Sequence, residues 1–201
     1  KELSISGKSE AKQFLAKLKA GEFMLNDSLK VDNFSFNASS TRDSASFQLS
    51  TRNADSSKIY IDIGATTYFR NKEIALTLLP QSVLVIDKHQ WHFSPSNTIV
   101  FGNDIVFRDF KIFKDDKESL EISGKVSNNS TDILNLNFQN FELQPLNHIF
   151  KNYDFELGGV ANGTVDFHTE NDKPMLKADL AIKNFAYYAD TLGDAIIKSD
   201  F

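Results

Sequence analysis

The chain has 201 residues, of which 41% are hydrophobic, and a chain of this length can bury a real core as one domain or as two small ones. Its 22 basic and 27 acidic residues argue against nucleic acid as a partner, because phosphate binding needs a concentrated basic face. Cysteine is absent, which excludes disulfides, thiolate metal sites and a cysteine nucleophile. The 18 Phe residues indicate either a thick core or an apolar surface kept for a ligand.

Two short windows along the chain have helical patterns. Over Ser9–Lys19, apolar residues recur at the spacing of one helix face, Ser9 can serve as an N-cap, and Gly21 can close the helix. The second window is Leu143–Phe150, with Pro145 near its start. We expect both to be short helices that pack on an edge or an end of a sheet, because an exposed sheet edge must be covered.

The rest of the chain is dominated by alternation of apolar and polar residues with a period of two. Such strands have one apolar and one polar face and belong to an antiparallel sheet. The alternating runs are Phe34/Phe36, Phe47/Leu49, Ile59/Ile61/Ile63, Ile74/Leu76/Leu78, Leu120/Ile122, Leu134/Leu136/Phe138, Val165/Phe167 and Leu176/Ala178/Leu180/Ile182. Turns rich in Asn and Asp separate many of them, at Arg52–Ser57, Arg70–Lys72, Lys114–Lys117, Ser127–Asp132 and Glu170–Pro174. The prediction is an all-β fold.

One run changes its phase. Apolar residues stand at Leu134, Leu136 and Phe138, and then resume at Phe141 and Leu143. A slip of one residue turns the following side chains to the other face unless a β-bulge absorbs it. We therefore expect a bulge near Gln139-Asn140.

The sequence also contains an internal echo, in which Leu3–Lys8 (LSISGK) recurs as Leu120–Lys125 (LEISGK). Recurrence at strand–turn junctions favours a stacked β architecture in which each unit packs on its neighbour. The chain begins at Lys1 and ends inside the predicted strand Ala195–Phe201. We therefore expect residues 1–201 to be a single β-rich fragment of a longer, repeat-built protein.

Candidate chemical sites are few. Asp87, His89 and His92 suggest a metal site, but alternation puts His92 on the opposite face and catalytic zinc usually needs three ligands, so a structural role is favoured. Trp91 is either a core side chain or a sugar platform, and the core interpretation is favoured because hydrophobic residues alternate around it. The glycines at 158, 159 and 163 lack a following helix and indicate bends or bulges. We predict no catalytic, metal or cofactor-binding residue, and hence no enzyme.

Five short sequence patterns follow one another from Leu79 onward. They are Leu79-Pro80-Gln81-Ser82 to Ile86 with Trp91-His92-Phe93-Ser94-Pro95-Ser96-Asn97 and Ile99; Leu120-Glu121-Ile122-Ser123-Gly124; Asp132-Ile133-Leu134-Asn135-Leu136 to Phe141, Leu143, Leu146-Asn147 and Phe150; Gly159-Val160-Ala161-Asn162-Gly163-Thr164-Val165; and Lys173-Pro174-Met175-Leu176-Lys177-Ala178-Asp179-Leu180. In this order they resemble the translocation and assembly module subunit TamB and its AsmA-like relatives. Residues 79–201 thus form a TamB-like β region, whereas the leading part, residues 1–78 with its short helix at about 9–19, matches only in its strand pattern.

The resemblance implies a fold, a place and a role. The fold is a curved, mostly antiparallel β-sheet folded as a taco or open sandwich with an apolar interior. The place is the periplasm of a double-membrane bacterium, where the parent chain is anchored in the inner membrane and pairs with an outer-membrane barrel protein of the Omp85 type. The role is to carry phospholipid to the outer membrane or to assist protein assembly there.

Nine residues of the alternating strands are candidates for the lining of the apolar side, where phospholipid acyl chains would lie. They are Ile122, Leu134, Leu136, Phe138, Val165, Phe167, Leu176, Leu180 and Ile182. Burial of an acyl chain contributes about 0.8 kcal/mol per CH₂. Two alternatives stay open at this point: a sealed structural spacer, in which these residues pack on each other in a closed sandwich, and a non-catalytic β-sandwich binding module of the adhesin or glycan-binding type.

Overall fold

The computed structural model describes residues 3–10, 13–26, 29–51, 59–86, 88–150, 156–170 and 173–199. These residues form fifteen β-strands and one short α-helix, which confirms the prediction of an all-β antiparallel fold. The chain divides into two compact units, Lys1–Gly102 (unit 1) and Asn103–Phe201 (unit 2), which are described separately below. Residue 79 is not the boundary between these units, and it marks only where the sequence resemblance begins.

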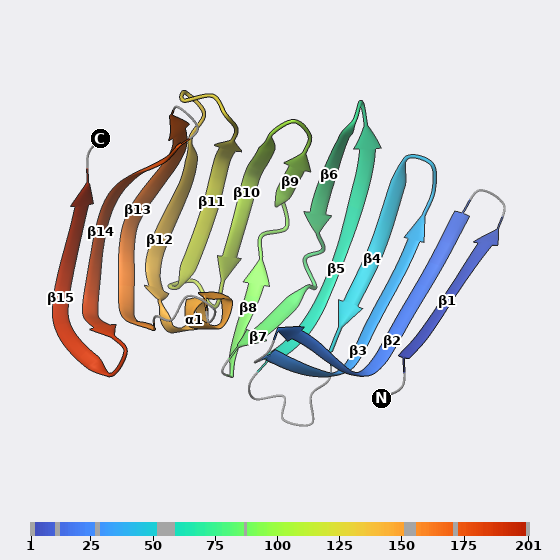
Figure 1. Cartoon of the computed structure of the whole chain (residues 1–201), viewed down its shortest axis with the longest axis horizontal. Helices are drawn as coiled ribbons and strands as arrows, with labels where there is room; N and C mark the ends of the chain where they lie inside the picture. Colours follow the sequence, from blue (N-terminus) through green and yellow to red (C-terminus); the bar gives the residue numbers. More distant parts are fainter. Residues whose placement is uncertain are drawn as a thin grey trace. The chain divides into compact units, whose positions relative to one another are not determined.

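Unit 1 is a layer of antiparallel strands (Figure 1). Its strands are β1 Leu3–Glu10, β2 Gln13–Asn26, β3 Leu29–Ser40, β4 Ser44–Ser50, β5 Ile59–Arg70, β6 Glu73–Leu78, β7 Val83–Ile86, β8 His89–Phe93 and β9 Thr98–Phe101. Their hydrogen-bonded order is β1-β2-β3-β4-β5-β6-β9, and β7 pairs with β5 and β8. Asn71 and Lys72 close the β5–β6 hairpin with positive φ angles, so the turn predicted at Arg70–Lys72 is confirmed. The turn predicted at Arg52–Ser57 lies outside the described residues.

The helix predicted over Ser9–Lys19 is wrong. Its described residues belong to β1 and β2, which form a hairpin with Ser9 paired to Phe14 and Glu10 to Gln13. The segment also fits a period of two, because Phe14, Ala16 and Leu18 stand at alternate positions with Lys17 and Lys19 between and after them. Tertiary context decides between the two periods, because β2 pairs with β1 over Gln13–Ala20 on one side and with β3 over Phe14–Asn26 on the other.

Two interruptions in the ladder of unit 1 are repaired by buried polar side chains. Strand β5 pairs with β6 over Ala65–Arg70 and with β7 over Ile59–Asp62, so the chain between β6 and β7 leaves the ladder. There the fully buried Ser82 hydroxyl accepts a hydrogen bond from Gly64 N at 3.1 Å and donates to Gly64 O at 3.0 Å. Ser82 therefore replaces a strand partner for the Gly64 backbone.

The second interruption lies between β8 and β9. The side chain of Asn97 is fully buried, accepts a hydrogen bond from Leu78 N at 2.8 Å and donates to Leu78 O at 3.1 Å. It also donates to Ser94 O across the turn. Because buried backbone groups need partners, Asn97 takes the place of a strand residue beside the end of β6. This explains in physical terms why an Asn follows the Trp and Pro of the sequence pattern.

Unit 2 contains the remaining strands and the helix (Figure 1). The elements are β10 Ile105–Phe113, β11 Ser119–Val126, β12 Leu134–Glu142, α1 Gln144–Phe150, β13 Leu157–Glu170, β14 Lys173–Tyr187 and β15 Asp190–Ser199. The strands pair in chain order, each antiparallel to the next. The helix predicted at Leu143–Phe150 is confirmed as α1.

The predicted bulge near Gln139-Asn140 is confirmed. The register between β12 and β13 shifts between Phe138 and Phe141, and Asn140 has a φ of 45°. The backbone N–H of Asn140 donates to Asn162 Oδ1 at 2.9 Å, so the bulged residue keeps a hydrogen-bond partner. The extra residue returns Phe141 to the face that carries Phe138, and the two rings meet edge to face with their centroids 5.8 Å apart.

Candidate functional site: the apolar face of unit 2

Apolar side chains form rows across the strands of unit 2. Directly paired residues of an antiparallel ladder share a face, as do alternate residues along a strand. The rows are Leu134–Phe167–Leu176, Ile122–Leu136–Val165–Ala178, Leu120–Phe138–Gly163–Leu180–Ile197 and Phe141–Ala161–Ile182–Ala195. All nine candidate residues lie in these rows, on one face that we call the apolar face. The candidate set missed Leu120, Phe141 and Ile197, although period-two alternation marks Leu120 as well.

The end of the apolar face next to α1 is buried. Phe141, Ala161 and Ile182 are between 1% and 5% exposed, and they form the row nearest to the helix. Helix α1 contacts β13, and the Asn147 side chain holds the start of that strand by two hydrogen bonds of 2.9 Å, one with Leu157 N and one with Leu157 O. The expectation that the helix packs at an end of the sheet is met here. Ile182 is accordingly a core residue, although it is one of the nine.

The opposite end of the apolar face is open to solvent. Leu176 is 51% exposed, and the seven candidate residues other than Leu176 and Ile182 are half-buried. At this end lies a hollow of about 330 Å³, near the lower end of the size range of ordinary ligand pockets. Ile105, Val126 and Phe167 supply its apolar lining, and Asn103, Asp104, Ser127, Asn128 and Thr169 supply polar groups. The hollow thus combines apolar and polar surface at the open end.

The other face of unit 2 is polar, and side chains of opposite charge pair there across neighbouring strands. Lys111 Nζ lies 2.7 Å from Glu121 Oε1, and Lys198 Nζ lies 3.6 Å from Asp179 Oδ1. Asn135 donates to Asp166 Oδ1 at 2.6 Å. Exposed cross-strand pairs of this kind contribute roughly 0.2–1 kcal/mol each. The sheet is therefore two-faced, with charge and amides on one side and Leu, Ile, Val and Phe on the other.

Ionic clusters hold the turns of unit 2. Burial alone would lower the pKa of Lys114, but hydrogen bonds and charge attraction from Glu118, 2.6 Å away, and Glu142, 3.5 Å away, raise it above its usual value. At the β11–β12 turn, the Ser127 hydroxyl at 2.6 Å and the Lys125 ammonium at 2.9 Å hold the pKa of Asp132 below its usual value. These groups stabilise turns, and Ser127 also lines the hollow at the open end of the apolar face.

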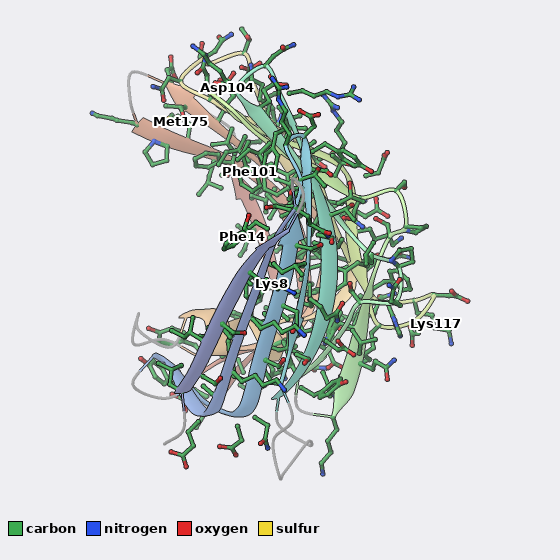
Figure 2. All side chains as sticks on the ribbon, turned by 90° about the vertical axis from the view of Figure 1, so that its right-hand side faces the viewer. Lys8, Phe14, Phe101, Asp104, Lys117 and Met175 are labelled. Carbon is green, nitrogen blue, oxygen red and sulfur yellow. The ribbon has the colours of Figure 1, made fainter. Side chains whose placement is uncertain are left out.

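Unit 1 has an apolar face of the same kind, which the candidate residues did not include. One row crosses five of its strands as Ile5–Leu18–Phe36–Leu49–Ile63. In Figure 2 the labelled Phe14 and Phe101 point to the left of the strands, and they are 52% and 39% exposed. Alternation in β3, β4 and β5 indicated this face from the sequence, but the helical interpretation of residues 9–19 concealed its continuation into β1 and β2.

The structure places the other candidate residues as follows. Trp91 is 2% exposed, which confirms its interpretation as a core side chain and leaves no ring face for a sugar. His89 pairs with Ile86 and His92 with Val83, so the two imidazoles lie on opposite faces of β8, and Asp87 lies outside the described residues. Gly159 sits at a register shift with a φ of 114°, as expected of a glycine at a bulge.

No protein-family model matches the chain, and no curated protein or solved structure matches it either. Within the described part of the chain, no three His, Cys, Asp or Glu side chains gather closely enough to hold a metal ion. Nor is any helix of that part long and apolar enough to cross a membrane. What the described geometry can support is non-covalent binding of apolar groups along an open sheet face.

Proposed function

We propose that the chain is a periplasmic segment of a TamB/AsmA-like protein and that its apolar face holds phospholipid acyl chains on their way to the outer membrane. The same face would equally hold apolar strands of outer-membrane proteins during assembly. In this proposal the parent chain is anchored in the inner membrane and works with an outer-membrane barrel partner of the Omp85 type. The role is binding and conduction, without catalysis.

The observation that carries the proposal is that the apolar rows of unit 2 remain partly exposed to solvent. Soluble sheets normally cover one face with a second layer, so that Leu and Ile in the middle of strands become buried. In unit 2, described strands form one layer (Figure 1), and Leu136, Val165 and Leu180 stay half-buried in its middle. An exposed apolar surface of this kind marks an interaction site in a soluble protein.

Acyl chains fit this surface chemically. They are linear and purely apolar, and the apolar face offers successive rows of apolar residues without a charged residue among them. Contact stabilises the bound chain by about 0.8 kcal/mol for each CH₂ that leaves water. The polar groups around the hollow at the open end, such as Asn103 and Ser127, are suitable neighbours for the ester or headgroup end of such a molecule.

The two rival functions are weaker on specific grounds. A sealed spacer requires the apolar rows to be buried along their length, whereas Leu176 is 51% exposed and the buried residues are the row beside α1 with Phe110 and Leu120. A glycan-binding module requires an exposed aromatic platform, and Trp91, which was the candidate for it, is buried. The exposed aromatic pair Tyr187–Tyr188 meets edge to face at 4.8 Å and does not present one flat platform.

The test is lipid binding by matched charge variants. The purified chain is incubated with vesicles of a zwitterionic phospholipid, separated from them by gel filtration, and analysed for bound phospholipid by mass spectrometry. Leu136→Asp adds a carboxylate to the apolar face, and Asn137→Asp adds the same group to the next residue, which lies on the polar face. Far-ultraviolet circular dichroism checks that both variants fold.

The expected result is that the unmodified chain and Asn137→Asp retain phospholipid, whereas folded Leu136→Asp loses it. Absence of phospholipid from the unmodified chain would contradict the proposal and favour the spacer. Equal loss in the two variants would also contradict it, because the effect would then come from added charge and not from the apolar face.

A further inference from the structure

The hollow at the open end of the apolar face forms because β12 is shorter at this end than the two strands beside it. Strand β12 begins at Leu134, which pairs with Gly124 of β11 and with Phe167 of β13. Both neighbours continue past this row, β11 to Val126 and β13 to Glu170. No residue of β12 therefore stands between Val126 and the end of β13, and the hollow of about 330 Å³ lies there.

The apolar lining of the hollow continues the apolar face. Ile105 pairs with Val126, and Val126 stands at an alternate position to Gly124, so both side chains lie on that face. Phe167 belongs to the row Leu134–Phe167–Leu176 itself. A molecule whose polar end occupies the hollow would therefore place an apolar tail directly on the apolar rows.

Asp104 is the charged residue among the described side chains that line the hollow. The other polar groups of the lining, from Asn103, Ser127, Asn128 and Thr169, are neutral amides and hydroxyls. Asp104 directly precedes β10 at the end of the strands (Figure 2), and its side chain is 36% exposed, so a ligand can reach its carboxylate. The described lining thus offers a carboxylate to a ligand cation, and it offers no cationic side chain to a ligand anion.

The ion pairs of Asp104 do not neutralise the charges beside the hollow. Lys125 Nζ lies 2.9 Å from Asp104 Oδ2 and 2.9 Å from Asp132 Oδ2. Two carboxylates thus share one ammonium, and the group of three carries one net negative charge. Because a carboxylate offers about four acceptor positions, the contact with Lys125 leaves positions on Asp104 for another donor.

We propose that the hollow binds the head group of a phospholipid through a primary ammonium held by Asp104, while the acyl chains lie on the apolar rows. This inference rests on the proposed function and adds to it a preference among phospholipids. A primary ammonium donates three hydrogen bonds, which Asp104 and the amide oxygens of Asn103 and Asn128 can accept. A trimethylammonium head has the same charge but donates none, and a head without an amine would bring only its phosphate charge to the carboxylate.

Competition between two phospholipids tests the preference. The whole chain is incubated with vesicles that contain equal amounts of phosphatidylethanolamine and phosphatidylcholine with identical acyl chains. The protein is separated by gel filtration, and both bound lipids are quantified by mass spectrometry. Asp104→Asn removes the charge with little change in volume. Asp132→Asn is the matched control, because Asp132 also binds Lys125 at 2.9 Å but is not among the described residues that line the hollow. Circular dichroism checks that both variants fold.

The expected result is a bound ratio of phosphatidylethanolamine to phosphatidylcholine that exceeds the vesicle ratio by about two- to fivefold, as expected of a partly exposed ion pair. In folded Asp104→Asn the ratio should fall to that of the vesicles, whereas Asp132→Asn should keep the preference. Phosphoethanolamine, which carries the same head without acyl chains, should not lower the amount of bound phospholipid at equal concentration.

The outcomes separate this inference from the proposed function. A bound ratio equal to that of the vesicles in the unmodified chain would overturn the head-group preference and leave the acyl-chain proposal standing. Absence of both lipids would overturn the two together. An equal loss of preference in the two variants would overturn the role of Asp104, since net charge and not contact in the hollow would then set the ratio. Competition by phosphoethanolamine would overturn phospholipid as the occupant of the hollow.

Discussion

Replacing Asn97 with Ala should destabilise unit 1 more than its small size suggests. The side chain is fully buried and makes three hydrogen bonds, with Leu78 N, Leu78 O and Ser94 O. At a net value of about 0.5–1.5 kcal/mol for each bond, with buried backbone groups left unpaired, the loss is about 2–4 kcal/mol. With a urea m-value of about 2 kcal/mol/M, the unfolding midpoint should fall by about 1–2 M.

The assay follows the fluorescence of Trp91 during urea unfolding. Trp91 is the single tryptophan of the chain and is 2% exposed in unit 1, so its signal reports that unit. Asn97→Asp keeps an acceptor for Leu78 N but loses both donated bonds and buries a charge, so it should be at least as destabilising as Ala. Ser96→Ala, at an exposed position in the same turn, should change stability by less than about 0.5 kcal/mol. A loss below about 1 kcal/mol in Asn97→Ala, or an equal loss in Ser96→Ala, would refute the role assigned to this side chain.

Three further predictions concern unit 2. Ile182→Ala should cost about 2–4 kcal/mol in thermal or urea unfolding and Leu176→Ala less than about 1 kcal/mol, since they share a strand and a face but are 5% and 51% exposed; equal costs would contradict the closed and open ends described. Asn140→Gly should be nearly neutral, whereas Asn140→Val should cost about 1–2 kcal/mol because its φ is 45°, and a neutral Val variant in the same melts would argue against the bulge. The folded pKa of Asp132 lies below its unfolded value near 3.8, so its contribution to stability is present above that pH and disappears as the pH falls through the folded pKa. The difference between the urea midpoints at pH 5 and at pH 3 should therefore be smaller in Asp132→Asn than in the unmodified chain. An equal difference in the two proteins would contradict this.

The sequence predicts the parts of this fold that follow from local alternation. Leu134, Leu136 and Phe138 indicated both a strand and its apolar face, and the slip to Phe141 located the bulge, because strand geometry has a period of two whatever the neighbours are. The short run at residues 9–19 satisfied two periods at once. There the pairing of β2 with β1 and β3 decided the outcome, and such pairing cannot be read from eleven residues.

Other features depend on contacts between residues distant in sequence. The buried side chain of Asn97 serves the backbone of Leu78, and Ser82 serves that of Gly64, 18 residues away. Nothing local distinguishes these residues from ordinary turn residues. The exposure of the apolar face also escaped the sequence, since alternation reports which side chains share a face but not what covers them.

The central claim is that the apolar face of unit 2 contacts acyl chains, and site-specific photo-crosslinking in living cells tests it most directly. A photoreactive residue is placed at Leu136 or Leu180 on the apolar face, and at Asn137 or Asp179, the adjacent positions on the polar face. The account predicts phospholipid adducts by mass spectrometry at the first pair and none at the second. Absence of adducts at Leu136 and Leu180, or equal yields at all four positions, would contradict it.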